Sequence, residues 1–462
     1  MSRTSPAPRK KKIKERPTLL RTLTVTDGVA ILVGITIGAG IYSTPQIIAG
    51  YLGSFSSILF LWVIVGAFVF LSGLVYAELG TRIPSTGGEY VCLHRCFGPF
   101  AGFMFGWSQL FIIRTSPAAA LALVSADYMG YFVQMSPIAR TLAAAGIILI
   151  LGLVNYIGVR SASLYQKIST SLKVGGLFAL IIIGLILLQG QESLLTGKVP
   201  PPGEFHPFRN IAAALMLILF THTGWERLGY VAGEMKDPRR VIPKSLIIGI
   251  LILVGSYVLI NIVYHWTLGM EGMRESSIVA SDTAVRLMGP VGASFVALLV
   301  IISATGSING TIMASTRVYY AMARDGLFFR WLDHIHPRFR TPGRAIIVHC
   351  AWAIVILFFR GSFETIAAGM VFALLIFYSA SAMALFKLRR RGEGRQDAYH
   401  VPFYPFLPGV YLAGCLALLA ARLIFEWQNS LVDLAFVATG LPFSLIWLRR
   451  RKTSSQTSSQ LG

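Results

Sequence analysis

Long apolar runs alternate with short polar connections along almost the whole chain. Each run is about twenty residues long, which is the length a helix needs to cross a hydrocarbon core of roughly 30 Å. One such run could be a buried helix of a soluble protein, but a dozen in series predicts a bundle of membrane-spanning helices. The predicted helices cover residues 25–49, 56–80, 98–125, 138–158, 164–189, 208–233, 243–268, 289–322, 342–360, 363–387, 403–423 and 430–449.

Two of these runs are interrupted. The first reads GITIGAGIYSTP at 34–45 and carries Gly34, Gly38 and Gly40, while the sixth reads FTHTGWE at 220–226. Glycine costs a helix about 1 kcal/mol relative to alanine, and unpaired backbone within a membrane is tolerated only where it is buried in protein or lines a cavity. Breaks at matching places in two halves of a chain indicate a substrate site between inverted repeats. The alternative is that the glycines only allow close helix packing.

The composition and the placement of charge fit a membrane protein. Hydrophobic residues make up 55% of the chain and charged residues 13%. The net charge of +21 does not indicate nucleic-acid binding, because the basic residues gather between the apolar runs rather than along one face. If the N-terminal tail is cytoplasmic, 30 of the 41 Lys and Arg lie in the two tails and in every second connection. This bias predicts a multi-pass protein of the cell membrane, inner or plasma, with both termini in the cytoplasm.

The connections are short, so we expect one membrane domain without a soluble appendage. The largest outer connection is expected at 270–288, and a polar inner connection at 84–90. Asn309 is interpreted as a residue that hydrogen-bonds between helices. Four cysteines are interpreted as packing residues, since two thiols spaced i, i+4 without histidine partners are a weak metal signal. They are Cys92, Cys96, Cys350 and Cys415.

No catalytic residue, metal or cofactor is expected. The sequence lacks HExxH and GxxxxGK[ST], and its eight histidines do not cluster with paired carboxylates within one span. A channel or receptor is an alternative class, but no filter-like repeat or ring of charges is present. The pattern therefore favours a transporter that is embedded in the lipid bilayer and binds a small molecule.

Four motifs, in order, carry a resemblance to a known family. They are GITIGAGIYSTP at 34–45, ELGTRIPSTGGEY at 78–90, FTHTGWE at 220–226 followed by GEMKDPRRVIP at 233–243, and SINGTIMASTRVYYAMARDG at 307–326. Together they resemble the amino acid–polyamine–organocation superfamily, and within it the L-type amino acid transporter branch. The resemblance implies an all-α integral membrane protein with the leucine-transporter fold, in which five helices, an inverted repeat of five and two more make twelve. It also implies that helices 1, 2, 6 and 7 rock against helices 3, 4, 8 and 9.

The resemblance divides the chain into five parts. They are a disordered basic cytoplasmic tail at 1–22, a first repeat at 23–190, an inverted second repeat at 205–388, helices eleven and twelve at 400–450, and a cytoplasmic tail at 451–462.

An amino acid presents a carboxylate and an ammonium, and a broken helix can hold both. Free N–H groups after a break lie at the positive end of a half-helix and suit the carboxylate. By the resemblance these are the amides of Ala39 and Gly40, with Gly38 at the break itself. Ala39 replaces the usual serine, which removes a hydroxyl contact but keeps the backbone contacts. Carbonyl groups freed by the breaks suit the ammonium, and those implied are Thr36, Ile37, Phe220 and Thr223.

Three side chains near the second break have alternative interpretations. Phe220 matches an aromatic gate above the substrate, or is simply a core residue. His222 is either a packing histidine or a contact to substrate or proton. Glu226, which follows Gly224, is an ionisable group at membrane depth and therefore a functional candidate. It could pair with Arg227 or another base, take up a proton during coupling, or attract a basic substrate.

Lys173 lies in the middle of the fifth predicted helix. A buried ammonium needs a partner or loses its proton. In the sodium-independent carriers that the chain resembles, a lysine here occupies the place of a sodium ion, which implies Ser303 or Ser307 as its partner. The alternative is a lysine that snorkels to the membrane surface.

The sequence thus predicts a sodium-independent permease or exchanger of neutral L-amino acids that works by alternating access. The alternative is a proton-coupled transporter of cationic amino acids or polyamines. The connection at 125–137 has no cysteine, so by comparison with animal L-type carriers we expect no disulfide-linked heavy chain.

Overall fold

The computed structural model describes residues 21–84, 88–187, 206–324, 326 and 328–445. Within these ranges the chain is helical, with no β-strand and one isolated bridge between Leu23 and Met235. The helices are α1 (Val25–Thr36), α2 (Thr44–Tyr51), α3 (Phe55–Arg82), α4 (Glu89–Phe97), α5 (Pro99–Ser108), α6 (Thr115–Met129), α7 (Pro137–Ile157), α8 (Val159–Leu187), α9 (Pro207–His222), α10 (Pro238–Glu275), α11 (Val279–Arg324), α12 (Gly343–Arg360), α13 (Phe363–Arg390), α14 (Phe406–Phe425) and α15 (Trp427–Ala438). Shorter 3₁₀ or π segments are η1 (Ala39–Tyr42), η2 (Gln109–Ile113), η3 (Trp225–Glu234) and η4 (Arg330–Leu332).

In the described part of the chain, nine helices are long and apolar enough to cross a membrane. They are α3, the continuous α5–η2–α6, α7, the Leu164–Leu187 part of α8, and α10 to α14. Large apolar side chains cover the outside of these helices, with Phe60 62% exposed and Ile150 63% exposed. Ionisable and polar side chains such as Lys173 and Asn309 are buried instead. This distribution is that of a protein with a lipid-facing exterior.

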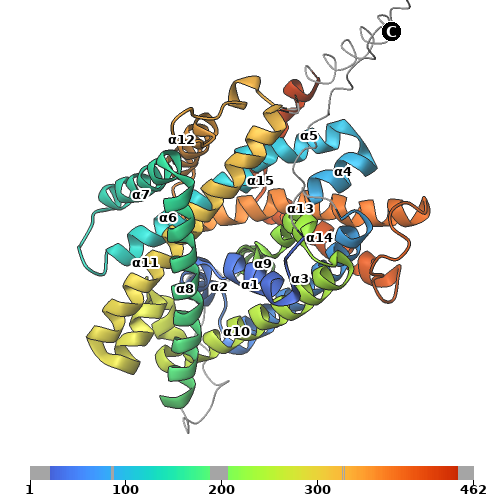
Figure 1. Cartoon of the computed structure of the whole chain (residues 1–462). Coiled ribbons are helices and arrows are strands. Elements are labelled where there is room, and N and C mark those ends of the chain that lie inside the picture. The colour runs from blue at the N-terminus through green and yellow to red at the C-terminus, as the bar shows by residue number, and fades with distance from the viewer. Residues whose placement is uncertain (1–20, 85–87, 188–205, 325, 327, 446–462) are drawn as a thin grey trace, which may run out of the picture.

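The centre of the bundle holds two interrupted helices that run antiparallel (Figure 1). The first consists of α1, η1 and α2, and the second of α9 and η3. The half α1 packs against η3, and the half α2 packs against α9, so the two interruptions face each other. The bridge between Leu23 and Met235 joins the residue before α1 to the residue after η3, at the ends of these halves that lie away from the interruptions.

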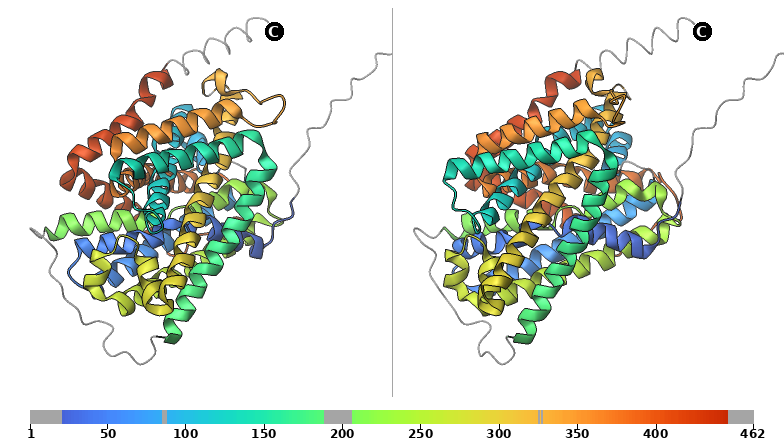
Figure 2. Two further views of the ribbon diagram at one scale, coloured as in Figure 1. Left: turned by 90° about the vertical axis from the view of Figure 1, so that its left-hand side faces the viewer. Right: turned by 60° about the vertical axis from the view of Figure 1, so that its left-hand side comes forward.

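Longer helices enclose this pair. The helix α10 packs on α1 and α3, α13 packs on α9, α6 and α14, and α11 packs on α6 and α8. Figure 2 shows α8 as a long tilted helix on the outside of the bundle. The residues that face the two interruptions therefore come from α8, α10, α11 and α13.

Two predicted connections contain helical residues. The outer connection expected at 270–288 contains the last turns of α10, which continues to Glu275, and the first turns of α11, which begins at Val279. Gly269 (φ 71°) and Gly289 (φ 72°) turn the chain within these helices, since glycine adopts left-handed conformations at little cost. The inner connection expected at 84–90 runs into α4, a short helix that the apolar pattern did not reveal because only one of its faces is buried.

The packing predictions for cysteine and asparagine are confirmed. All four cysteines are free and buried. The amide of Asn309 on α11 accepts a hydrogen bond from Asn155 on α7 at 2.8 Å, and donates one to Gln166 on α8 at 3.2 Å. The three helices are thereby joined by polar groups inside the bundle.

Some predictions lie outside the described residues. These are most of the basic tail expected at 1–22, the C-terminal tail at 451–462, and the last residues of the helix expected at 430–449.

Candidate functional site

The first interruption lies between Thr36, where α1 ends, and Ala39, where η1 begins. Ile37 and Gly38 have extended backbone there, with ψ of 99° and −172°. The last carbonyls of one helix and the first amides of the next therefore meet without a continuous helical ladder. No side chain caps the start of η1. The predicted break is thus present at the predicted residues.

The second interruption lies at Thr223 and Gly224, between α9 and η3. Gly224 has φ of 124°, a conformation that a side chain disfavours. A Cβ atom at Gly224 would also lie only 3.2 Å from the Cα atom of Thr36. Glycine is therefore needed here both for the backbone conformation and for the close approach of the two interrupted helices.

Tyr257 of α10 ties the two interruptions together. Its hydroxyl lies 3.2 Å from the carbonyl oxygen of Thr36 and 3.1 Å from that of Thr221. One O–H group is thus shared between carbonyls that belong to different interrupted helices. A second link joins the hydroxyls of Thr44 and Thr221 at 3.0 Å. Sequence reasoning missed Tyr257, whose only signal is a tyrosine within an apolar span.

The predicted carboxylate amides lie at the first interruption, and the predicted ammonium carbonyls lie at both interruptions. Ala39 and Gly40 open η1 and are buried. The hydroxyl of Thr36 is buried and has no hydrogen-bond partner among the described residues. The carbonyl of Phe220, one of the predicted ammonium ligands, already accepts hydrogen bonds from the amide of Thr223 at 3.1 Å and from its hydroxyl at 2.7 Å.

The ring of Phe220 lies against the first interruption. A Cβ atom at Gly40 would be 3.6 Å from its Cε1 atom. The ring also packs edge-to-face on Phe363, at the start of α13, with ring centroids 5.5 Å apart. Phe220 thus lies between the predicted carboxylate amides and α13, where a gating aromatic residue would be expected.

His222 packs among aromatic rings. Its Nδ1 lies 2.8 Å from the carbonyl oxygen of Ile218, one turn earlier in α9. Its ring packs against Trp62 of α3 and against Tyr257, with centroids 5.5 and 5.0 Å apart. Its Nε2 is buried without a hydrogen-bond partner among the described residues, so the packing role and the contact to substrate or proton both stay predictions.

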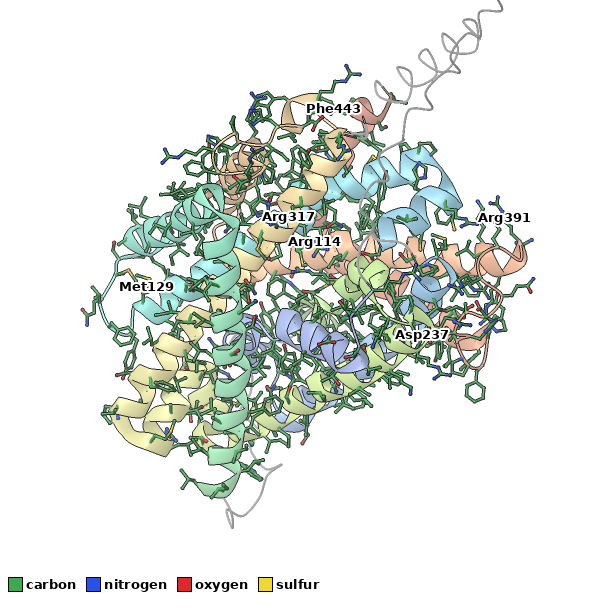
Figure 3. The ribbon with its side chains drawn as sticks, viewed as in Figure 1. Arg114, Met129, Asp237, Arg317, Arg391 and Phe443 are labelled. Atoms are coloured by element: carbon green, nitrogen blue, oxygen red, sulfur yellow. The ribbon has the colours of Figure 1, made fainter. Side chains whose placement is uncertain are left out.

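Glu226 is fully buried between two arginines. Its carboxylate accepts a hydrogen bond from the amide of Gly224 at 2.8 Å, and its Oε1 lies 3.8 Å from Arg114 and 3.9 Å from Arg227. Arg114 follows the π-helical turn η2, and its Nε donates to Gln109 at 2.6 Å. Turns of this kind are frequent at functional sites. Figure 3 places Arg114 near the middle of the molecule, away from its edges.

Lys173 reaches from α8 to α11 beside the first interruption. The side chain is only 1% exposed, and its Nζ donates to the hydroxyl of Ser307 at 3.3 Å. The same hydroxyl would lie 3.6 Å from a Cβ atom at Gly38. Ser303 is buried, and its hydroxyl has no hydrogen-bond partner among the described residues. Of the two predicted partners, the structure therefore has Ser307, and the snorkelling alternative does not fit a buried ammonium.

A small cavity adjoins the second interruption. Its volume is about 10 Å³, enough for about one water molecule. It is lined by Phe68, Val69, Ser72, Leu219, Thr223, Trp225, Val371, Leu374, Leu375 and Tyr378. The described residues contain no group of three metal-ligating side chains.

Comparison with known proteins gives one family and several transporters. A family model described as amino acid permease matches residues 23–447. The chain is 31% identical to the serine/threonine exchanger of Bacillus subtilis (strain 168) over 431 residues, which cover 92% of this chain and 96% of that protein. It is 29% identical to the cystine/glutamate transporter of Homo sapiens over 442 residues, covering 94% and 87%. It is 28% identical to the b(0,+)-type amino acid transporter 1 of Mus musculus over 442 residues, covering 93% and 88%.

Proposed function

Because the chain belongs to the amino acid permease family, we propose that it is a sodium-independent exchanger of neutral L-amino acids that works by alternating access. The chain is a multi-pass membrane transporter of amino acids, and not an enzyme. The proposal of sodium-independent exchange rests on one observation: the two helix interruptions meet beside Lys173 and Ser307.

The proposed architecture has twelve spans in the leucine-transporter arrangement. Nine helices of the described chain are long enough by themselves. The other three would be the interrupted pair, whose halves are each too short, and α15 with the residues that follow it. The antiparallel pairing of α1 with η3 and of α2 with α9 supports an inverted relation between repeats at 23–190 and 205–388, with two further helices at 400–450.

The substrate would bind through backbone groups at the first interruption. The amides of Ala39 and Gly40 open a helix and suit the carboxylate. The carbonyl of Ile37 and the unpartnered hydroxyl of Thr36 lie on the other side of the break and suit the ammonium. The carbonyl of Phe220 is a weaker candidate, because it already accepts two hydrogen bonds from Thr223.

Pairing is the role of Glu226 that the geometry supports. The carboxylate lies between the guanidinium groups of Arg114 and Arg227 and accepts a hydrogen bond from Gly224. A cationic substrate would have to compete with both arginines for this acid, and a charged group so enclosed is costly to expose or neutralise. This supports neutral substrates over cationic amino acids and polyamines.

Sodium independence is proposed from Lys173. Its buried side chain donates a hydrogen bond that joins α8 to α11 next to Gly38. A sodium ion would have to occupy the same poorly hydrated place, and an ammonium there would repel it strongly. Lys173 would therefore fill the structural role of a bound sodium ion, but as part of the chain it would not dissociate during the transport cycle.

Alternating access is proposed because the site is closed on all sides by protein. Ala39, Ile37 and Phe220 are buried, so an amino acid can reach the amides only if the surrounding helices move. The helices that would move together are the interrupted pair with α3 and α10, which pack on one another. Exchange fits this arrangement, since a bound amino acid would be needed for the return step.

The cellular setting is proposed from charge alone. The clustering of Lys and Arg at one end of the spans supports cytoplasmic termini in the cell membrane. The short connection between α6 and α7 has no cysteine, which supports a transporter without a disulfide-linked partner.

Competition uptake tests the substrate class. The purified protein would be reconstituted into liposomes that contain a neutral amino acid, and uptake of labelled serine would be challenged with unlabelled neutral, acidic and cationic amino acids. Neutral competitors should inhibit and arginine, lysine and polyamines should not. Uptake of arginine or lysine driven by an imposed pH gradient would instead support the proton-coupled cationic alternative.

A further inference from the structure

The end of α13 carries an open cleft on one face of the helix, here called the Lys387 cleft. It has a volume of about 540 Å³. Its lining residues are Met383, Phe386, Lys387, Arg390 and Arg391. These positions are spaced i, i+3, i+4, i+7 and i+8, so they form one stripe along the helix. Figure 3 places Arg391 at one edge of the molecule and Met129, the last residue of α6, at the opposite edge.

The stripe changes from apolar to basic along the helix axis. Met383, which is 44% exposed, and Phe386 lie within the apolar span, whereas the three basic residues lie where that span ends at Arg390. Phe386 packs against Tyr404 with ring centroids 5.7 Å apart. Next to Tyr404 the ring of Phe403 is 79% exposed. Exposed aromatic residues at the end of a span are typical of the membrane–water interface.

The acids at this end of the molecule are largely bound to other arginines. Arg389, on the opposite face of α13, donates two hydrogen bonds to Glu78, at 2.7 and 2.6 Å. Arg391 lies 3.4 Å from Glu393, which Arg95 also contacts at 3.3 Å.

The other two cations of the cleft lack an acidic partner. The ammonium of Lys387 lies over the ring of Phe97, 5.0 Å from its centroid. Arg390 is exposed. Among the described residues, neither has a carboxylate within ion-pair distance. The cleft therefore has uncompensated positive charge at the level of the lipid headgroups.

We propose that the Lys387 cleft binds the headgroup of an anionic phospholipid. The phosphate would lie between Lys387 and Arg390, and an acyl chain would lie along Met383 and Phe386. Guanidinium groups bind phosphate through paired N–H donors, and basic clefts at the cytoplasmic ends of transmembrane helices are suited to such headgroups. The apolar half of the stripe selects a lipid over a soluble phosphate, because a free anion would leave Met383 and Phe386 in contact with water.

The test uses the full-length protein in neutral detergent micelles. Its thermal unfolding midpoint would be titrated with dioleoylphosphatidylglycerol, and with dioleoylphosphatidylcholine as the zwitterionic reference. The double variant Lys387→Gln/Arg390→Gln should need on the order of tenfold more phosphatidylglycerol for half of the stabilisation. The matched control is Lys167→Gln/Arg324→Gln, which removes the same two charges from exposed residues outside the cleft. The control should behave as the wild type.

Three outcomes would overturn the proposal. They are an unchanged titration in the double variant, an equal loss in the control, and equal stabilisation of the wild type by glycerol 3-phosphate, which would identify a soluble anion as the ligand. If the double variant does not fold, Arg390→Gln alone provides the same comparison, because its side chain is exposed.

Discussion

The ammonium of Lys173 donates a hydrogen bond to the hydroxyl of Ser307 at 3.3 Å, next to the interruption at Gly38. The bond joins α8 to α11 across the bundle, beside the amides that the proposed function assigns to the substrate carboxylate. The Lys173 side chain thereby links α8 to α11 at the first interruption. Substrate binding and the cohesion of the scaffold would then depend on the same lysine.

Replacing Lys173 by alanine should leave the protein folded but nearly abolish transport. If the transport-competent state needs this hydrogen bond, worth about 1.5–3 kcal/mol, uptake should fall by about tenfold to a hundredfold. The measurement is initial uptake into proteoliposomes at equal protein content. Ser303→Ala is the matched control, because that hydroxyl has no hydrogen-bond partner in the described structure. Wild-type rates for Lys173→Ala would refute the sodium-surrogate role.

Gly40→Val should block substrate binding. A Cβ atom at Gly40 would already lie 3.3 Å from the hydroxyl of Thr221 and 3.5 Å from its Cα atom, so further methyl groups must displace backbone or fill the space over the amides. Gly40→Ala should be milder. Gly50→Val is the control for α2, since a Cβ atom there meets no described atom within 4 Å. Equilibrium binding of a labelled neutral amino acid reports the effect, and unchanged affinity in Gly40→Val would place the site elsewhere.

Tyr257→Phe tests the link between the two interruptions. Loss of the shared hydroxyl leaves the carbonyls of Thr36 and Thr221 short of a donor, which should lower stability by roughly 1–3 kcal/mol and slow transport. Tyr264→Phe is a matched control on the same helix, because the Tyr264 hydroxyl is buried without a hydrogen-bond partner. Chemical denaturation and uptake would be measured for both. Equal effects of the two substitutions would argue against a specific role for Tyr257.

Glu226→Gln should lower stability without changing which amino acids are transported. The substitution removes the negative charge between Arg114 and Arg227, and loss of one partner of a buried ion pair costs up to about 3–5 kcal/mol. Glu271→Gln, at an exposed position on α10, should be neutral. The relevant measurements are the unfolding midpoint and the competition profile. A selective loss of arginine or lysine binding would instead make Glu226 a substrate ligand.

The family and the helix interruptions could be predicted because their signals are local. Three glycines within seven residues mark the first break, and Gly224 marks the second. The lysine in an apolar span was equally visible, whereas its partner on the predicted eighth helix, Ser303 or Ser307, was implied only by the family resemblance. Membership in the predicted superfamily is confirmed.

The remaining features depend on contacts between distant parts of the chain. Arg114 meets Glu226 only because the fold brings residues far apart in the sequence together, and nothing in either segment alone indicates the pair. In the sequence, Tyr257 is an ordinary tyrosine within an apolar span. Its link between the two interruptions is visible only in the folded structure, where α10 packs against both. The helical turns at 270–288 were missed because their charged residues suggested a loop, while two glycines with positive φ allow the helices to fold back.

The most direct test of the central claim is uptake of a labelled neutral amino acid into proteoliposomes in sodium-free buffer, with and without the unlabelled amino acid inside. A sodium-independent exchanger should take up label rapidly only when the internal amino acid is present, and added sodium should change nothing. Uptake that requires sodium, or that proceeds equally well into empty liposomes, would contradict the account.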